Sequence, residues 1–136
     1  MFMYACKNGH IDIIKFILSL PANNININAD HDYAFRYACR NGYLEVVKYL
    51  LSLPNHNINI NADHDYIFRY ACRGGHLEVV KYLLSLPNHN INMNTCNDAA
   101  FRHACHNKHI KIVKYLLSLP NHNINIDGTF RHIDIE

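Results

Sequence analysis

The sequence repeats itself with a period of 33 residues, and this repeat limits the possible folds more than any other feature. Segments 28–60 and 61–93 differ at only four positions. A fixed period of this length predicts a tandem array in which neighbouring units stack on one another. We therefore interpret 1–136 as a single domain. It has a truncated first unit at 1–27, units at 28–60, 61–93 and 94–126, and a partial C-terminal unit or tail at 127–136.

Each unit carries two short helical patterns. In Tyr33 to Arg40 the only strongly polar side chains are Arg36 and Arg40, which are four residues apart and therefore share one helical face. Asn41-Gly42 then breaks the helix, because glycine adopts positive φ without steric cost. A second helix is expected from Tyr43 to Leu53, with a narrow polar stripe. Pro54 ends it, since proline lacks the amide hydrogen.

The remaining part of the unit is short and polar. Asn57 to Asn61 alternates asparagine with isoleucine, which indicates an extended finger with isoleucine on one side. Asp32, Asp65 and Asp98 precede the first helix of their units and are predicted to be its N-caps. Two short helices and a finger cannot bury their apolar surface alone, so an all-α solenoid follows. A β-solenoid is the alternative, but only about five residues per unit alternate whereas roughly twenty have the helical pattern.

These features resemble the ankyrin repeat. Gly75 to Leu84 reads G-H-L-E-V-V-K-Y-L-L, which is similar to the family signature, and Ala38-Cys39 resembles the paired small residues of its first helix. The resemblance covers roughly residues 2–126 and implies about four stacked helix-turn-helix units with short hairpin fingers. The N-H-N-I-N run after the proline further resembles the ankyrin arrays encoded by giant DNA viruses of amoebae. It implies a viral protein in the host-cell cytoplasm.

The chain departs from the family pattern in three places. Tyr33 to Arg36 stands where the family has T-P-L-H, so finger and helix must be joined differently, with Arg36 and the finger aspartates as the candidates. The hairpin glycine of the family is replaced by His31, His64 and Asn97, of which Asn and His tolerate left-handed backbone better than most residues. Lys108 replaces a turn glycine, at an expected cost of about 1–2 kcal/mol if its backbone is left-handed.

The resemblance implies binding of an unidentified protein partner through the fingers and first helices. The partner-binding positions that it implies are Asp30, Asp32, Arg40, Asn41, Asp63, Asp65, Arg73, Gly74, Cys96, Asp98, His106 and Asn107. A cationic row along the first helices consists of Arg36, Arg69 and Arg102 together with Arg40, Arg73 and His106. Two interpretations of the row stay open: a solvated face balanced by the aspartates, or a surface for an acidic or extended partner.

Other function classes find little support in the residues. The repeats supply near copies of the same side chains instead of an asymmetric catalytic set, so we expect no enzyme and no cofactor. The histidines and cysteines lack the two-plus-two spacing of a zinc site. Four cysteines recur once per unit on helices that stack about 8–10 Å apart, too far for disulfides. Cys96 lies outside this pattern, and we expect it to be the thiol that reacts first.

Charge and hydropathy point away from nucleic acid and membrane. The formal net charge is only +2, whereas a nucleic-acid-binding surface is expected to carry a concentrated basic stripe. The longest apolar stretch, Ile11 to Leu20, contains Asp12 and Lys15 and is too short to span a bilayer or to form a signal-peptide core. A cytoplasmic protein is expected.

The two ends of the array have no polar cap. Phe2 to Cys6 corresponds to Phe35 to Cys39, so the sequence starts within a unit, and the following helix is more apolar than its later copies. Stacked arrays need terminal units with polar outer faces. We therefore expect either a fragment of a longer array or an end that docks onto a partner or a second copy. A structural module that self-associates end to end is the alternative function.

Overall fold

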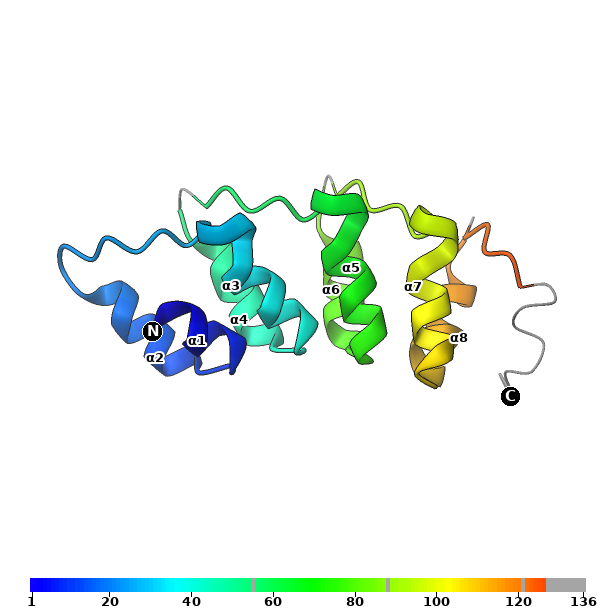
Figure 1. Ribbon diagram of the computed structural model, residues 1–136, viewed down its shortest axis with the longest axis horizontal. Coiled ribbons are helices and arrows are strands. Elements are labelled where there is room, and N and C mark those ends of the chain that lie inside the picture. The colour runs from blue at the N-terminus through cyan, green and yellow to red at the C-terminus, as the bar shows by residue number, and fades with distance from the viewer. Residues whose placement is uncertain (55, 88, 121, 127–136) are drawn as a thin grey trace.

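The computed structural model describes residues 1–126 except 55, 88 and 121. Within them the chain forms eight helices and no strand, as four helix pairs arranged side by side along the long axis (Figure 1). The pairs are α1 (Phe2–Lys7) with α2 (Ile11–Ser19), α3 (Ala29–Arg40) with α4 (Leu44–Ser52), α5 (Ala62–Gly74) with α6 (Leu77–Ser85), and α7 (Thr95–His106) with α8 (Ile110–Ser118). The all-α helix-turn-helix solenoid is confirmed. The expected partial unit at 127–136 lies outside the described residues.

The core runs through the row of pairs without interruption. The first helices α1, α3, α5 and α7 each contact the next, and each packs on the second helix of its own pair. One phenylalanine per unit, at Phe35, Phe68 and Phe101, is fully buried between the layers. Burying a side chain of this size contributes roughly 1.5–3 kcal/mol. Because neighbouring units supply part of the covering surface, the stability of one pair depends on the next.

The turn between the helices of a pair uses left-handed backbone. Gly42 has φ 82°, and the amide of Tyr43 donates to the carbonyl of Ala38 at 2.9 Å. The helix break predicted at Asn41-Gly42 is therefore confirmed. Lys108 occupies the same position in the last pair with φ 61°, so the expected penalty of about 1–2 kcal/mol applies to it.

The second helices end where proline predicts. The last helical residue of α4 is Ser52, and Leu53 turns to extended backbone before Pro54. The hydroxyl of Ser52 donates to the carbonyl of Tyr49 at 2.6 Å, which partners one of the last free carbonyls. The same bond recurs at Ser19, Ser85 and Ser118.

The linkers that join the pairs run extended along one edge of the row (Figure 1). Ile58 and Ile60 are half-buried against the core whereas Asn57 and Asn59 are exposed, so the predicted alternation is present. No strand pairing forms in the described residues, where backbone donors of the linker are bonded to side chains of the linker itself and of the preceding turn. The Asn61 amide, for example, donates to Asn59 Oδ1 at 3.0 Å.

The cysteines are free thiols, as expected. Cys6, Cys39, Cys72 and Cys105 are buried in the first helices, and Cys96 is exposed. Burial raises the pKa of the Cys6 thiol to about 12 and that of the Cys105 thiol to about 11. The reactive thiolate is therefore disfavoured at these two positions. That Cys96 reacts first stays a prediction.

Candidate interaction surface

The helices α3, α5 and α7 each contain one turn of left-handed backbone close to their start. Asp30, His31 and Asp32 have φ of 54°, 56° and 61°. The same conformation recurs at 63–65 and at 96–98, and we call these three segments the left-handed turns. His31, His64 and Asn97 therefore do adopt the backbone that the missing hairpin glycine predicted. Left-handed backbone costs a non-glycine residue roughly 1–2 kcal/mol, so other contacts must hold these turns in place.

The last aspartate of each left-handed turn supplies one such contact. Asp32 Oδ1 accepts a hydrogen bond from Asn28 Nδ2 at 2.8 Å, and its Oδ2 accepts from the amide of Asn59 at 3.1 Å. Asp65 and Asp98 repeat both bonds, to Asn61 and Asn92 and to Asn94 and Asn125. The predicted N-cap role is wrong, because the residues at the N-caps of α3, α5 and α7 are Asn28, Asn61 and Asn94. The carboxylate instead ties its turn to the next linker.

An arginine of the first helix supplies a second contact. Arg69 donates from Nε to the carbonyl of His64 at 2.9 Å and from Nη2 to the carbonyl of Asp63 at 3.0 Å. Arg102 makes the same pair of bonds to Asn97 and Cys96. The sequence indicated Arg36 for the joining of turn and helix, and it is the equivalent residues Arg69 and Arg102 that make these bonds. Arg36 differs, since its guanidinium lies 4.1 Å from the ring centroid of Tyr66.

Aromatic rings alternate with cations further along the first helices. Lys7 Nζ lies 5.2 Å from the ring centroid of Tyr37, and the Arg40 guanidinium lies 5.4 Å from Tyr37 and 5.2 Å from Tyr70. The Arg73 guanidinium also lies near Tyr70, 5.4 Å from its ring centroid. We call Lys7, Tyr37, Arg40, Tyr70 and Arg73 the first-helix ladder. Each such contact contributes about 0.5–1 kcal/mol at an exposed site.

The fourth unit changes the ladder to histidine. His103 and His106 stand where the third unit has Tyr70 and Arg73. The Nδ1 atom of His103 is buried and has no hydrogen-bond partner among the residues that the structure describes. Burial lowers the pKa of His103, and the positive charges of Arg73, Arg102, Arg69 and His106 lower it further. The ring therefore favours its neutral form.

The structure divides the partner-binding positions expected from the sequence into two groups. Eight are exposed: Asp30, Arg40, Asp63, Arg73, Gly74, Cys96, His106 and Asn107. Asp32, Asn41 and Asp98 are half-buried, and Asp65 is only 5% exposed. Asn41 Nδ2 donates to the carbonyl of Lys7 at 2.8 Å, so it also joins neighbouring units.

The exposed positions lie at opposite ends of the first helices. Asp30, Asp63 and Cys96 belong to the left-handed turns, whereas Arg40, Arg73 and His106 stand at the helix C-termini. Sequence reasoning missed Lys7, Tyr37 and Tyr70. The available signal was a tyrosine three residues before each arginine at the 33-residue period.

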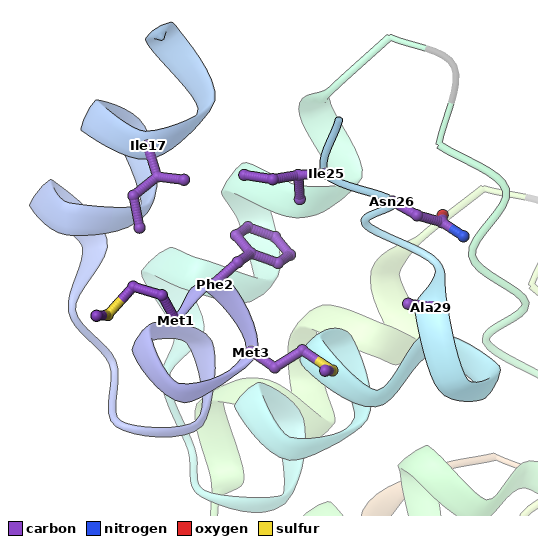
Figure 2. A pocket seen from close by; sticks show the side chains of 7 residues that line it. All are labelled: Met1, Phe2, Met3, Ile17, Ile25, Asn26 and Ala29. Atoms are coloured by element: carbon purple, nitrogen blue, oxygen red, sulfur yellow. The ribbon is translucent and has the colours of Figure 1, made fainter. Parts of the chain in front are cut away.

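A second surface lies at the N-terminal end of the row. A hollow of about 410 Å³ opens there, lined by Met1, Phe2, Met3, Ile17, Ile25, Asn26 and Ala29. Figure 2 shows Phe2 reaching from α1 between Ile17 of α2 and Ile25 of the following linker. Ile13 is 46% exposed, whereas the equivalent Val46 of the next unit is 1% exposed. The apolar face that later units bury against their predecessors is therefore open in the first unit.

A family model described as ankyrin repeats, in three copies, matches residues 1–64 and again residues 55–128. The chain belongs to the ankyrin-repeat family. Ankyrin repeats are generally protein-interaction modules, and the family is typically non-catalytic. No curated protein matches the sequence, so the resemblance to arrays of giant viruses finds no support from a relative.

Membrane-spanning helices and metal-binding clusters are both absent from the part of the ankyrin array that the structure describes. None of its helices in the described residues combines the length and hydropathy needed to cross a membrane. In the same residues, no three His, Cys, Asp or Glu side chains are grouped so that they could hold a metal ion.

Proposed function

We propose that this chain is a non-catalytic ankyrin module that binds a protein partner through its left-handed turns and first helices. The supporting observation is where its units differ. Segments 61–93 and 94–126 differ at 13 positions, and nine of these fall within residues 62–75. In contrast, 81–92 and 114–125 are identical. The later part of the second helix and the linker are repeated unchanged, while most of the differences fall in the left-handed turn and the first helix, as they would if these segments recognise a partner.

The proposed contact surface consists of the eight exposed positions of the expected set. The carboxylates of Asp32, Asp65 and Asp98 already accept hydrogen bonds from the linkers. In this proposal they shape the turns and leave contact with the partner to Asp30, Asp63 and Cys96. Arg40, Arg73 and His106 contribute the cationic end of the same surface.

A charge-reversal experiment tests the proposal. The wild-type chain, immobilised, is compared with Arg40→Glu/Arg73→Glu for the proteins it retains from its native cells. Lys111→Glu/Lys114→Glu is the matched control, because it changes the net charge equally at two exposed positions on α8. We expect proteins that the wild type and the control retain to be lost with the arginine variant. Equal retention by both double variants would exclude the first helices as the binding surface.

End-to-end self-association is a second candidate, which the open N-terminal face favours. Phe16 is 64% exposed there, and Met1, Tyr4, Ile13 and Leu20 are exposed with it. Apolar patches of this kind mark interaction surfaces. Light scattering at micromolar concentration is expected to show species larger than a monomer, and Ile13→Asp/Phe16→Asp to reduce them. A monodisperse wild-type monomer would remove this candidate.

The cellular setting stays a prediction from the sequence. A cytoplasmic location, or the host-cell cytoplasm for a viral source, agrees with a protein-binding role. Imaging of the chain with a fluorescent tag in its native cells would test it.

A further inference from the structure

Within the described residues, the cations of the first-helix ladder have no acidic ion-pair partner. In the part of the chain that the structure describes, the ion pair formed is between Lys81 and Glu78 on α6, at 3.9 Å. Segments 33–44 and 66–77 contain no aspartate or glutamate. Arg40 and Arg73 are exposed and belong to these segments. In the described part of the chain, neither segment therefore supplies a carboxylate that would neutralise Arg40 or Arg73.

The tyrosines hold these guanidinium groups in place. Arg40 lies over both Tyr37 and Tyr70, and Arg73 lies over Tyr70. A guanidinium that stacks on a ring keeps its in-plane N–H donors available for a carboxylate. Because stacking already restricts the side chain, binding an anion loses less conformational freedom. The ladder is thus preorganised for carboxylates.

The spacing of the ladder defines the shape of the ligand. Its cations occur once per unit, on adjacent helices whose axes pack about 8–10 Å apart. A polyproline II segment rises about 3.1 Å per residue with three residues per turn. Every third side chain therefore lies on the same side, about 9 Å from the previous one. Carboxylates at every third residue would meet Lys7, Arg40 and Arg73 in turn.

We propose that the first-helix ladder binds an extended acidic polypeptide segment with a carboxylate at every third residue. This inference rests on the proposed function and specifies its partner. The alternative anion, a single-stranded nucleic acid, needs free ring faces on which bases can stack. Tyr37 is stacked on Tyr33 at 4.2 Å and Tyr70 on Tyr66 at 4.0 Å, and the ladder cations also lie over both rings. The rings are already occupied, which favours the polypeptide.

The test uses defined peptides and fluorescence anisotropy. A labelled peptide with four Glu-Pro-Pro repeats is compared with one of the same composition whose four glutamates are contiguous. We expect the periodic peptide to bind about tenfold more tightly, since only it places carboxylates at the unit spacing. Its binding is expected to weaken as salt is added, because the contacts are between exposed charges. Equal binding of the two peptides would overturn the proposed spacing.

Variants assign the binding to the ladder. Arg40→Glu/Arg73→Glu is expected to weaken binding of the periodic peptide at least about tenfold, and Lys111→Glu/Lys114→Glu to leave it nearly unchanged. Arg40→Gln/Arg73→Gln replaces the first variant if circular dichroism shows that charge reversal prevents folding. An unchanged affinity in the arginine variant, or tighter binding of a single-stranded oligonucleotide than of the peptide, would contradict the proposal. If the peptides fail but native-cell proteins are still lost on arginine reversal, the interaction function stands without the acidic ligand.

Discussion

At the scale of single residues, Lys108 shows a local conflict between sequence and backbone. Its φ is 61°, where the equivalent Gly42 and Gly75 have 82°. Lys108→Gly should raise the free energy of unfolding by about 1 kcal/mol. It removes the steric cost of left-handed backbone in the folded state, and the greater conformational entropy of glycine in the unfolded chain offsets part of this gain. Urea denaturation measures the change. Lys111→Gly is the control, and inside α8 it should lower stability by about 1 kcal/mol. A loss of stability in Lys108→Gly would contradict the strain.

His103 predicts a dependence of stability on pH. Its pKa is lowered in the fold by burial and by neighbouring positive charge, so the unfolded chain takes up the proton first as pH falls. Stability is then complete above the unfolded pKa of about 6.5 and falls as pH drops from there through the folded pKa. His103→Tyr, which restores the residue found at Tyr70, should make this fall smaller. The fall should not vanish, since burial also lowers the pKa of His76. Thermal denaturation of both chains between pH 7 and pH 5 measures the fall, and an equal fall in the wild type and in His103→Tyr would contradict the prediction.

At the scale of elements, the sequence predicted those parts that local chemistry decides. The expected second helix at 43–53 is observed as Leu44–Ser52, because glycine before it and proline after it act on their own neighbours. The start of the first helix was less well predicted. Asp32 looks like an N-cap, yet its carboxylate reaches the amide of Asn59, 27 residues further on. No local sequence pattern around Asp32 shows that the linker after the second helix will lie against it.

The same reasoning explains why the candidate site was only partly predictable. The arginines were identified by their period, but the tyrosines that hold them belong in part to the next unit, as Tyr70 does for Arg40. From the sequence, Asp32, Asp65 and Asp98 were grouped with exposed positions, because the burial of these side chains depends on how the units stack. Asp65, for instance, accepts bonds from Asn92 at the end of its own unit and from Thr95 of the following unit.

Asp65 provides the test at this scale. Asp65→Asn should lower the free energy of unfolding by about 1–3 kcal/mol. The new amide NH₂ group would replace one carboxylate oxygen, so a buried hydrogen-bond donor would face the donors that this oxygen now accepts from. Asp63→Asn, in the same left-handed turn but exposed, is the matched control and should change stability little. Chemical denaturation compares the two. Equal effects would mean that the bond between turn and linker does not stabilise the array.

At the scale of the whole molecule, the array consists of units that each depend on their neighbours. The second unit is covered on both sides, since α3 contacts α1 as well as α5. In the first unit, α1 has only six residues, and Ile13 and Phe16 of α2 are exposed. Stability in such arrays is roughly a sum of unit and interface terms. Opening should therefore begin in the unit with the fewest interfaces.

Hydrogen exchange tests this gradient and the open face together. At low micromolar concentration, amides of α1 and α2 should exchange faster than those of α5 and α6, because local opening there breaks one interface in place of two. Raising the concentration should slow exchange in α2 if the open face docks onto a second copy, and Ile13→Asp/Phe16→Asp should abolish that slowing. Uniform protection of all helices at low concentration would contradict the dependence on neighbours. If exchange in α2 does not depend on protein concentration, self-association through this face is excluded, but the predicted difference between the first unit and the inner units still stands.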